Sequence, residues 1–237
     1  MLSETSLKQF AIKFQTSFLN ISREYIQNLF LSYLYRQKKS EHLAFKGGTA
    51  LKIVFGSPRF SEDLDFSSNL TPYHLQELLE QTLKKLTQEM PLIKIEESKK
   101  TSGGYFARYI FEIYDQKISI ELNISLRDKT KPEPTLVTTP LLPAYQCLIL
   151  PTKKLVWEKI DALFRRQKPR DFFDLYFFLR ERRGLEEIIA KKKKLLEVLR
   201  DLDANQMKRE LKLLLPATYK GLLKDFPKLL ISELKRL

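Results

Sequence analysis

The sequence has little cysteine and glycine and no long hydrophobic run. Cys147 is the only cysteine among 237 residues, which excludes an intrachain disulfide and argues against a zinc cluster. The 7 glycines and 11 prolines are too few for a fibrous or disordered chain. No apolar stretch approaches the roughly 18 residues of a membrane span, and the first residues lack the pattern of a secretory signal. We therefore expect a globular protein of the reducing cytoplasm that makes no membrane contact.

Positive charge is in excess and is unevenly distributed. Residues 1–150 carry 19 Lys and Arg against 16 Asp and Glu, a net of +3, whereas residues 151–237 carry 23 against 13, a net of +10. This asymmetry favours an acidic partner, most often nucleic acid. A lysine-rich, solvated helical surface would explain it equally well, so charge alone leaves both interpretations open.

Hydrophobic periodicity predicts an α+β first part and a helical second part. Strands are expected at 43–45, 63–66, 92–98, 104–114 and 117–125, the last two joined by a tight turn at 115–116. Helices are expected within the first forty residues and at 49–55 and 72–89. The four prolines of residues 128–143 predict a linker or an extended crossing segment. Further helices are expected at 151–167, 169–182, 185–200, 203–215 and 217–236. We place the domain boundary between residues 1–145 and 146–237.

Two glycines lie at the predicted turn from the first strand to the next helix. In Phe45-Lys46-Gly47-Gly48-Thr49, the missing Cβ atoms allow a sharp turn whose amide groups approach a ligand closely. Lys46 would add a full positive charge, which suits phosphate oxygens. Taken alone, a Gly-Gly pair at such a turn is more often only a tight connection.

Asp63 and Asp65 alternate with Leu64 and Phe66, so a strand would direct both carboxylates to one side. Such neighbouring charges repel unless a cation neutralises them, and Mg²⁺ prefers carboxylate and phosphate oxygens. Glu121, on the polar side of its strand, would complete a two-metal site. The alternatives are a solvated strand face for the aspartates and a solvated surface residue for Glu121.

The order of these elements resembles the nucleotidyltransferase superfamily with the DNA polymerase β-like fold. Two sequence motifs are similar to those of the AbiEii/AbiGii toxin family, which includes the MenT transferases. The first is Phe45-Lys46-Gly47-Gly48-Thr49-Ala50-Leu51, and the second is Arg59-Phe60-Ser61-Glu62-Asp63-Leu64-Asp65-Phe66. The resemblance implies a small mixed sheet flanked by helices and then an α-helical C-terminal part. It also implies a nucleoside triphosphate (NTP) substrate and two Mg²⁺ ions.

The resemblance assigns roles to particular residues of this chain. The residues implied for nucleotide binding are Lys46, Gly47, Gly48, Thr49, Arg59 and Ser61. Asp63, Asp65 and Glu121 are implied as catalytic metal ligands, and Lys159 and Asp171 as further catalytic residues. Asp174 competes with Asp171 for the last role, and we prefer Asp171 because it directly follows Lys168-Pro169-Arg170. A network of interhelical salt bridges without chemistry is the alternative for this segment.

The resemblance further implies a toxin that acts on RNA, at the 3′ end of tRNA, and is paired with a winged-helix antitoxin. Two other functions remain open. One is a non-catalytic module that binds nucleic acid or a partner protein on a transferase fold. The other is a transferase with a small-molecule acceptor.

Overall fold

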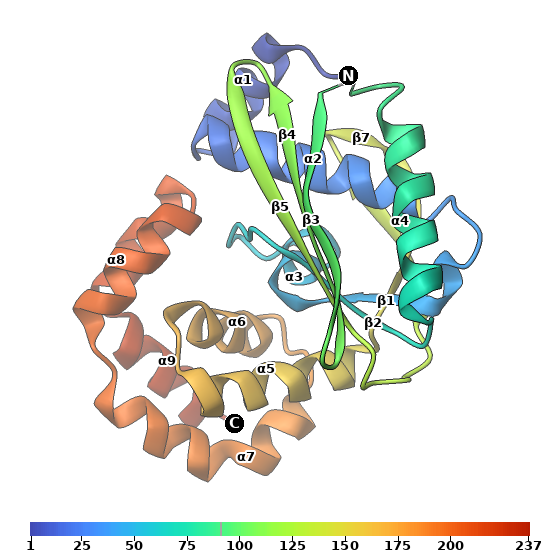
Figure 1. Cartoon of the computed structure of the whole chain (residues 1–237). Coiled ribbons are helices and arrows are strands. Elements are labelled where there is room, and N and C mark those ends of the chain that lie inside the picture. Colours follow the sequence, from blue (N-terminus) through green and yellow to red (C-terminus); the bar gives the residue numbers. More distant parts are fainter. Residues whose placement is uncertain (91) are drawn as a thin grey trace. The chain divides into compact units, whose positions relative to one another are not determined.

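The computed structural model describes residues 1–90 and 92–237, which form two compact units. The first unit comprises residues 1–56 and 60–150, and the second comprises residues 57–59 and 151–237 (Figure 1). The boundary expected after residue 145 lies inside the strand Leu142–Ile149. The second unit also includes three residues from the first half of the sequence, among them Arg59.

The first unit contains a seven-stranded mixed sheet. Its strands are β1 (Leu43–Lys46), β2 (Leu64–Ser68), β3 (Ile93–Thr101), β4 (Gly104–Ile113), β5 (Gln116–Ser125), β6 (Glu133–Thr139) and β7 (Leu142–Ile149). Its helices are α1 (Glu4–Lys13), α2 (Phe18–Leu34), α3 (Gly47–Ile53) and α4 (Pro72–Leu86), with a 3-10 turn at Ser40–His42. The order is β3-β4-β5-β2-β1-β7-β6, with β2–β5 and β1–β7 parallel. The α+β class and the mixed sheet with flanking helices are confirmed.

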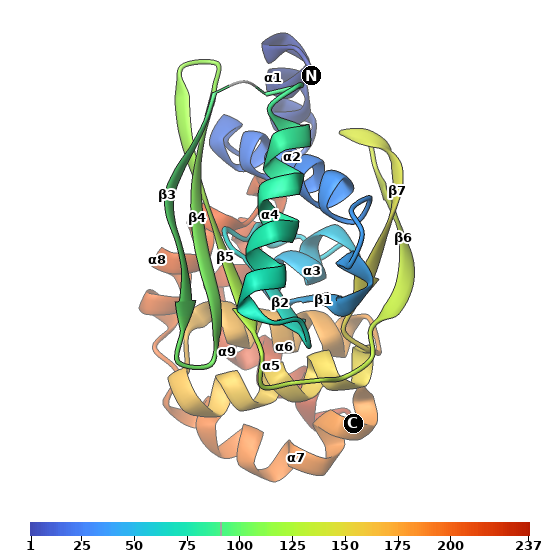
Figure 2. The ribbon, with the colours of Figure 1, turned by 45° about the vertical axis from the view of Figure 1, so that its right-hand side comes forward.

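Helices α2 and α4 cover one face of this sheet (Figure 2). Alternate residues of β5 from Ile118 to Ile124 are at most 3% exposed and face these helices. Leu29 and Phe30 of α2 are buried against them in the same core. The polar residues of β5, including Glu121 and Asn123, therefore lie on the opposite face of the sheet.

Of the two alternatives for residues 128–143, the linker is wrong. The segment is extended over β6 and the start of β7, but these strands pair as an antiparallel hairpin. Pro134 is compatible with β6 because β6 is an edge strand, where an amide donor is not needed on the outer side. The tight hairpin between β4 and β5 is present, but its two-residue turn lies one position earlier than the expected 115–116, because Gln116 already pairs with Ile113 in the sheet. Its turn residues are Tyr114 and Asp115, whose φ angles of 46° and 59° occur here without glycine.

The second unit is helical, as expected. It contains α5 (Thr152–Arg166), α6 (Pro169–Arg180), α7 (Leu185–Val198), α8 (Ala204–Leu214) and α9 (Phe226–Lys235), with 3-10 segments at Leu199–Asp201 and Ala217–Lys224. The single helix expected over 217–236 is wrong. Pro227 lies in the first turn of α9, and its ring and missing N–H prevent an α-helix from running through it. Phe172, Phe173 and Phe178 of α6 are core residues.

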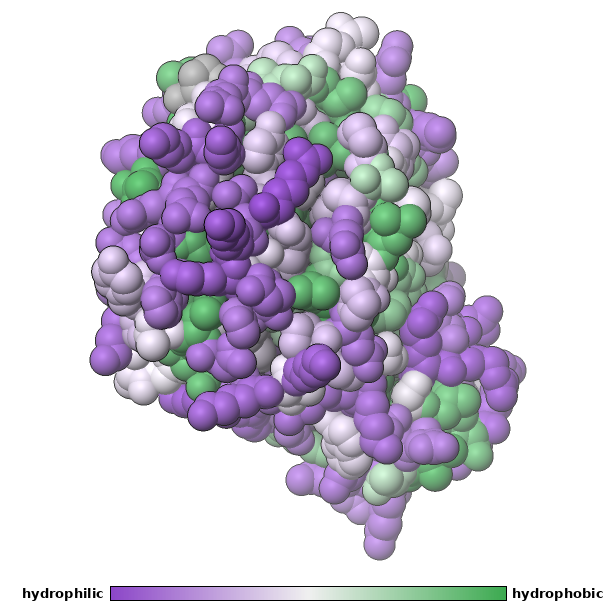
Figure 3. All heavy atoms as spheres, turned by 90° about the vertical axis from the view of Figure 1, so that its right-hand side faces the viewer, coloured by the Kyte–Doolittle hydropathy of each residue, from purple (hydrophilic) through white to green (hydrophobic). Residues whose placement is uncertain are grey.

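The face shown in Figure 3 is dominated by polar and charged side chains, and its hydrophobic residues form only small, separate groups. No helix within the described residues has the length and hydropathy needed to cross a bilayer. Several lysines of α7 have specific neighbours. Lys191 lies 5.4 Å from the Trp157 ring centre and Lys194 lies 4.4 Å from that of Phe164, so part of this basic run packs on α5 through cation–π contacts.

Candidate active site

The turn between β1 and α3 needs glycine for two independent reasons. Gly47 has a φ of +81°, a left-handed conformation that other residues rarely adopt. A Cβ atom built on Gly47 would also lie 2.1 Å from Oδ2 of Asp65. The carboxylate of Asp65 therefore lies directly against the Gly47 backbone, which brings together the two motifs that the sequence separates by a helix.

The register of the sheet places the acidic motif next to this turn. Asp65 is paired with Lys46 of antiparallel β1 on one side and with Asn123 of parallel β5 on the other. Leu64 is fully buried, whereas Asp63 and Asp65 on either side of it are half-buried. This alternation places both carboxylates on the sheet face away from α2 and α4.

The backbone just before β2 is held by side chains. The Thr49 hydroxyl donates to the Asp63 carbonyl. Gln27 of α2 donates from Nε2 to the carbonyls of Ser61 and Glu62, at 3.1 and 2.9 Å. Gln27 was not among the residues predicted from the sequence. The available signal was a polar amide within the hydrophobic stretch of a helix, where it needs a hydrogen-bond partner.

Glu121 lies on the same face but has a cationic partner. It accepts hydrogen bonds from Arg108 Nε at 2.9 Å and Nη2 at 2.8 Å. Leu64 of β2 pairs with Leu122 of the parallel strand β5. Asp63 directly precedes Leu64 and Glu121 directly precedes Leu122, so the two acidic residues occupy equivalent positions on neighbouring segments. Within the described residues no three His, Cys, Asp or Glu side chains form a group that could hold a metal. The metal role of Glu121 therefore stays a prediction.

A groove of about 590 Å³ extends along the sheet from Lys46 and Asp65. It continues past Asn123 and Phe106 to the turn between β3 and β4, where Arg127 lines it. Its lining includes four basic residues, Lys46, Lys99, Arg108 and Arg127, and two acidic ones, Asp65 and Glu97. The groove is therefore net positive and suits an anionic ligand.

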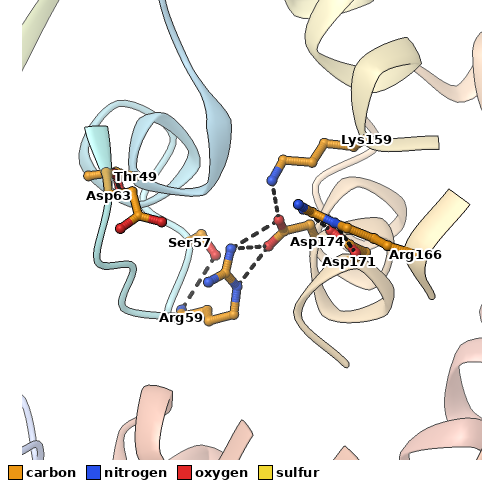
Figure 4. A network of polar contacts seen from close by, with 8 residues as sticks. All are labelled: Thr49, Ser57, Arg59, Asp63, Lys159, Arg166, Asp171 and Asp174. Carbon is orange, nitrogen blue, oxygen red and sulfur yellow. Dashed lines mark hydrogen bonds and ion pairs between the residues drawn. The ribbon is translucent and has the colours of Figure 1, made fainter. Parts of the chain in front are cut away.

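Arg59, Asp174 and Lys159 form a buried ionic network within the second unit (Figure 4). Arg59 donates to Asp174 from Nε at 2.9 Å and from Nη2 at 3.0 Å, and Lys159 Nζ lies 2.6 Å from Asp174 Oδ2. Asp174 is 0% exposed, Arg59 2% and Lys159 11%. Burial alone would raise the pKa of Asp174, but Arg59 and Lys159 outweigh it and lower the pKa below its ordinary value.

Asp171 has a different partner. Arg166 of α5 donates to both of its carboxylate oxygens, at 2.8 and 2.6 Å. Asp171 is fully buried, but Arg166 remains 41% exposed. The structure thus brings Lys159 together with Asp174, and it places the guanidinium of Arg59, which was expected at the nucleotide, on the same carboxylate.

Comparisons with known proteins identify the family and the fold of this chain. The family model described as nucleotidyl transferase AbiEii toxin, Type IV toxin–antitoxin system, matches residues 29–234. The nucleotidyltransferase toxin MenT4 from Mycobacterium tuberculosis H37Rv is 17% identical, with a TM-score of 0.68, over 100% of this chain and 91% of that one. No curated protein matches the sequence.

Two structures from Helicobacter pylori are also similar. A putative nucleotidyltransferase is 21% identical with a TM-score of 0.57, covering 91% of this chain and 96% of that one. The protein JHP933 is 21% identical with a TM-score of 0.57, covering 93% and 95%. At these identities the structural matches establish a shared fold, while the family model establishes the family.

Proposed function

Because the chain belongs to the AbiEii nucleotidyltransferase toxin family and is a nucleotidyltransferase, we propose that it transfers a nucleotide from an NTP to a hydroxyl of RNA, at the 3′ end of tRNA. The observation that carries this proposal is the contact of Asp65 with Gly47, beside Lys46 and at the end of a net-positive groove. A phosphate-binding turn and a carboxylate are thereby adjacent, as nucleotide transfer requires.

The donor set fits magnesium. Asp63 and Asp65 supply carboxylate oxygens from one face of the sheet, and both are half-buried rather than solvated. Glu121 is proposed as the third carboxylate of a two-ion site, which its register next to Asp63 supports. Such ions, when bound, lower the pKa of an attacking hydroxyl and stabilise the charge of the leaving pyrophosphate.

The remaining roles follow from charge and position. Lys46 is proposed to bind phosphate oxygens where the glycines leave the backbone accessible, with Gly48 and Thr49 completing the turn. Lys159 is proposed to bind phosphate as well. The ammonium group of Lys159 has three N–H donors, and its hydrogen bond to Asp174 uses one of them. Asp171 and Asp174 would act by holding cationic side chains in place rather than by contacting the nucleotide.

RNA as the acceptor class is supported by the distribution of positive charge. Residues 151–237 carry a net charge of +10, and the groove of the first unit is lined by twice as many basic as acidic residues. Phosphate backbones are bound mainly through such charges, so the affinity falls as salt rises. Pairing with a winged-helix antitoxin is part of the same proposal and is supported by the toxin family to which the chain belongs.

Labelling of RNA tests the proposal directly. Purified protein is incubated with each α-labelled NTP, Mg²⁺ and total tRNA, and the RNA is separated on a denaturing gel. We expect labelled tRNA with the wild type and none with Asp63→Ala/Asp65→Ala. Glu80→Ala, an exposed substitution on α4, serves as the control and should label normally. Equal labelling by the double variant would contradict the proposal.

The two alternative functions give different results in the same experiments. A non-catalytic module would label no RNA and would show no Mg²⁺-dependent stabilisation by NTP in thermal denaturation. A transferase with a small-molecule acceptor would label no RNA, would release pyrophosphate only when its small acceptor is supplied, and would show no salt-sensitive binding of tRNA.

A further inference from the structure

Gln27 of α2 holds the backbone that leads into the acidic strand, and we propose that it is a positioning residue for Asp63. Its side-chain amide donates two hydrogen bonds to consecutive carbonyls, those of Ser61 and Glu62. The residue is 1% exposed. A buried amide without hydrogen-bond partners would lower the stability of the fold. The two hydrogen bonds therefore fix the Gln27 amide and the two carbonyls relative to one another.

Three consecutive carbonyls before β2 are bound by side chains. Gln27 binds those of residues 61 and 62, and Thr49 binds that of Asp63. The strand β2 begins only at Leu64. The first register pairs of β2 are Asp65 with Lys46 of β1 and Leu64 with Leu122 of β5, so the contacts from the side chains of α2 and α3 lie on the chain just before these pairs.

Other residues of α2 hold the same segment at both ends. Arg23 forms an ion pair with Glu62 at 3.3 Å. Glu24 lies 3.7 Å from Lys52 of α3, whose ammonium lies 4.1 Å from the centre of the Phe60 ring. Gln27 is the most buried member of this set and the one that binds the backbone. Helix α2 thus has a polar strip that fixes residues 60–62 in addition to its core-facing residues.

This inference rests on the proposed function, because it assumes that Asp63 binds a metal ion. Residues that orient a metal ligand typically contribute about 10- to 100-fold to metal affinity or activity. Replacing Gln27 by methionine keeps the length of the side chain but removes both donors. The carbonyls of residues 61 and 62 would then turn towards water, and the Asp63 carboxylate would lose its fixed direction.

Binding of Mn²⁺ alone, followed by the electron paramagnetic resonance signal of the free ion, tests the inference without an activity measurement. We expect wild-type protein to bind Mn²⁺ and Asp63→Ala to lose that site. Gln27→Met should bind about 10- to 100-fold more weakly. In RNA labelling, the Mg²⁺ concentration for half-maximal rate should rise correspondingly in Gln27→Met.

Asn28→Leu is the matched control. Asn28 is also 1% exposed and is also hydrogen-bonded, to Glu24 O and the Tyr145 hydroxyl, but not to residues 61–63. Asn28→Leu should lower the melting temperature about as much as Gln27→Met does, while its affinity for Mn²⁺ should stay within about twofold of that of the wild type. If Gln27→Met fails to fold, Gln27→Leu replaces it, because leucine also removes both donors and introduces no charge.

The outcomes separate the inference from the function it rests on. Wild-type protein without a Mn²⁺ site that depends on Asp63 would overturn the proposed function. If the wild type has the site, and the Gln27 variant and Asn28→Leu both bind Mn²⁺ as tightly as the wild type, only the positioning role is overturned.

Discussion

Arg59 and Asp174 are 115 positions apart in the sequence and form a buried ion pair through two nitrogens of the guanidinium, at 2.9 and 3.0 Å. Asp174 also binds Lys159, so one carboxylate pairs with two cations inside the second unit. This arrangement gives Arg59 a structural partner and makes Asp174, rather than Asp171, the aspartate connected to Lys159.

The two aspartates of α6 should differ in their contribution to stability. Asp174→Asn leaves Arg59 buried with a neutral partner, and breaking such a pair costs about 3–5 kcal/mol of unfolding free energy. Asp171→Asn should cost less, about 1–2 kcal/mol, because Arg166 is 41% exposed and can be hydrated. Urea unfolding followed by circular dichroism measures both. Equal losses would contradict the distinction between the two sites.

Stability should also depend on pH through Asp174. Its pKa in the folded state is lower than the ordinary value of 3.8, so its ionised form stabilises the fold. That contribution is complete above the ordinary pKa and is lost as the pH falls through the folded-state pKa. We therefore expect the stability difference between wild type and Asp174→Asn to be constant near neutrality and to shrink below about pH 3.8. A difference that persists at strongly acidic pH would show that ionisation is not its cause.

Gly47 and Gly56 provide a comparison at a similar, positive φ angle. Both have a positive φ, +81° and +74°, so alanine at either position should cost about 1–2 kcal/mol. Only at Gly47 would the new Cβ displace Asp65, because nothing lies within 4 Å of the corresponding position at Gly56. We expect Gly47→Ala to lower kcat by about 100-fold, the effect of a misplaced reactive group. Gly56→Ala should leave kcat nearly unchanged.

The role of Glu121 can be separated from that of its partner Arg108. If Glu121 completes the metal site, Glu121→Gln should lower kcat by about 100-fold, as the loss of a general base or ligand does. Arg108→Gln should leave kcat at saturating NTP within a few-fold, because Arg108 lines the groove and contacts Glu121 but is not proposed as a metal ligand. Initial rates at saturating NTP measure both variants. Equal effects would instead indicate that the pair acts as a unit in shaping the groove.

Much of the architecture could be predicted from local patterns. The alternation in residues 117–125 predicted β5, and the sequence 43–66 predicted a strand, a Gly-Gly turn and an acidic strand, all of which the structure contains. Such patterns are readable because each face of a strand or helix is either buried or solvated along its whole length. The hairpin of β6 and β7 was missed since prolines suit an edge strand as well as a linker.

The sequence by itself determined which residue types are available for chemistry and their order along the chain: Lys46 and Gly47 first, then Asp63 and Asp65. Only the tertiary structure decided their partners. Gly47 lies against Asp65, Gln27 binds the carbonyls of residues 61 and 62, and Asp174 binds Arg59. These choices depend on the register of the sheet and on the packing of helices, which place together residues that no local periodicity connects.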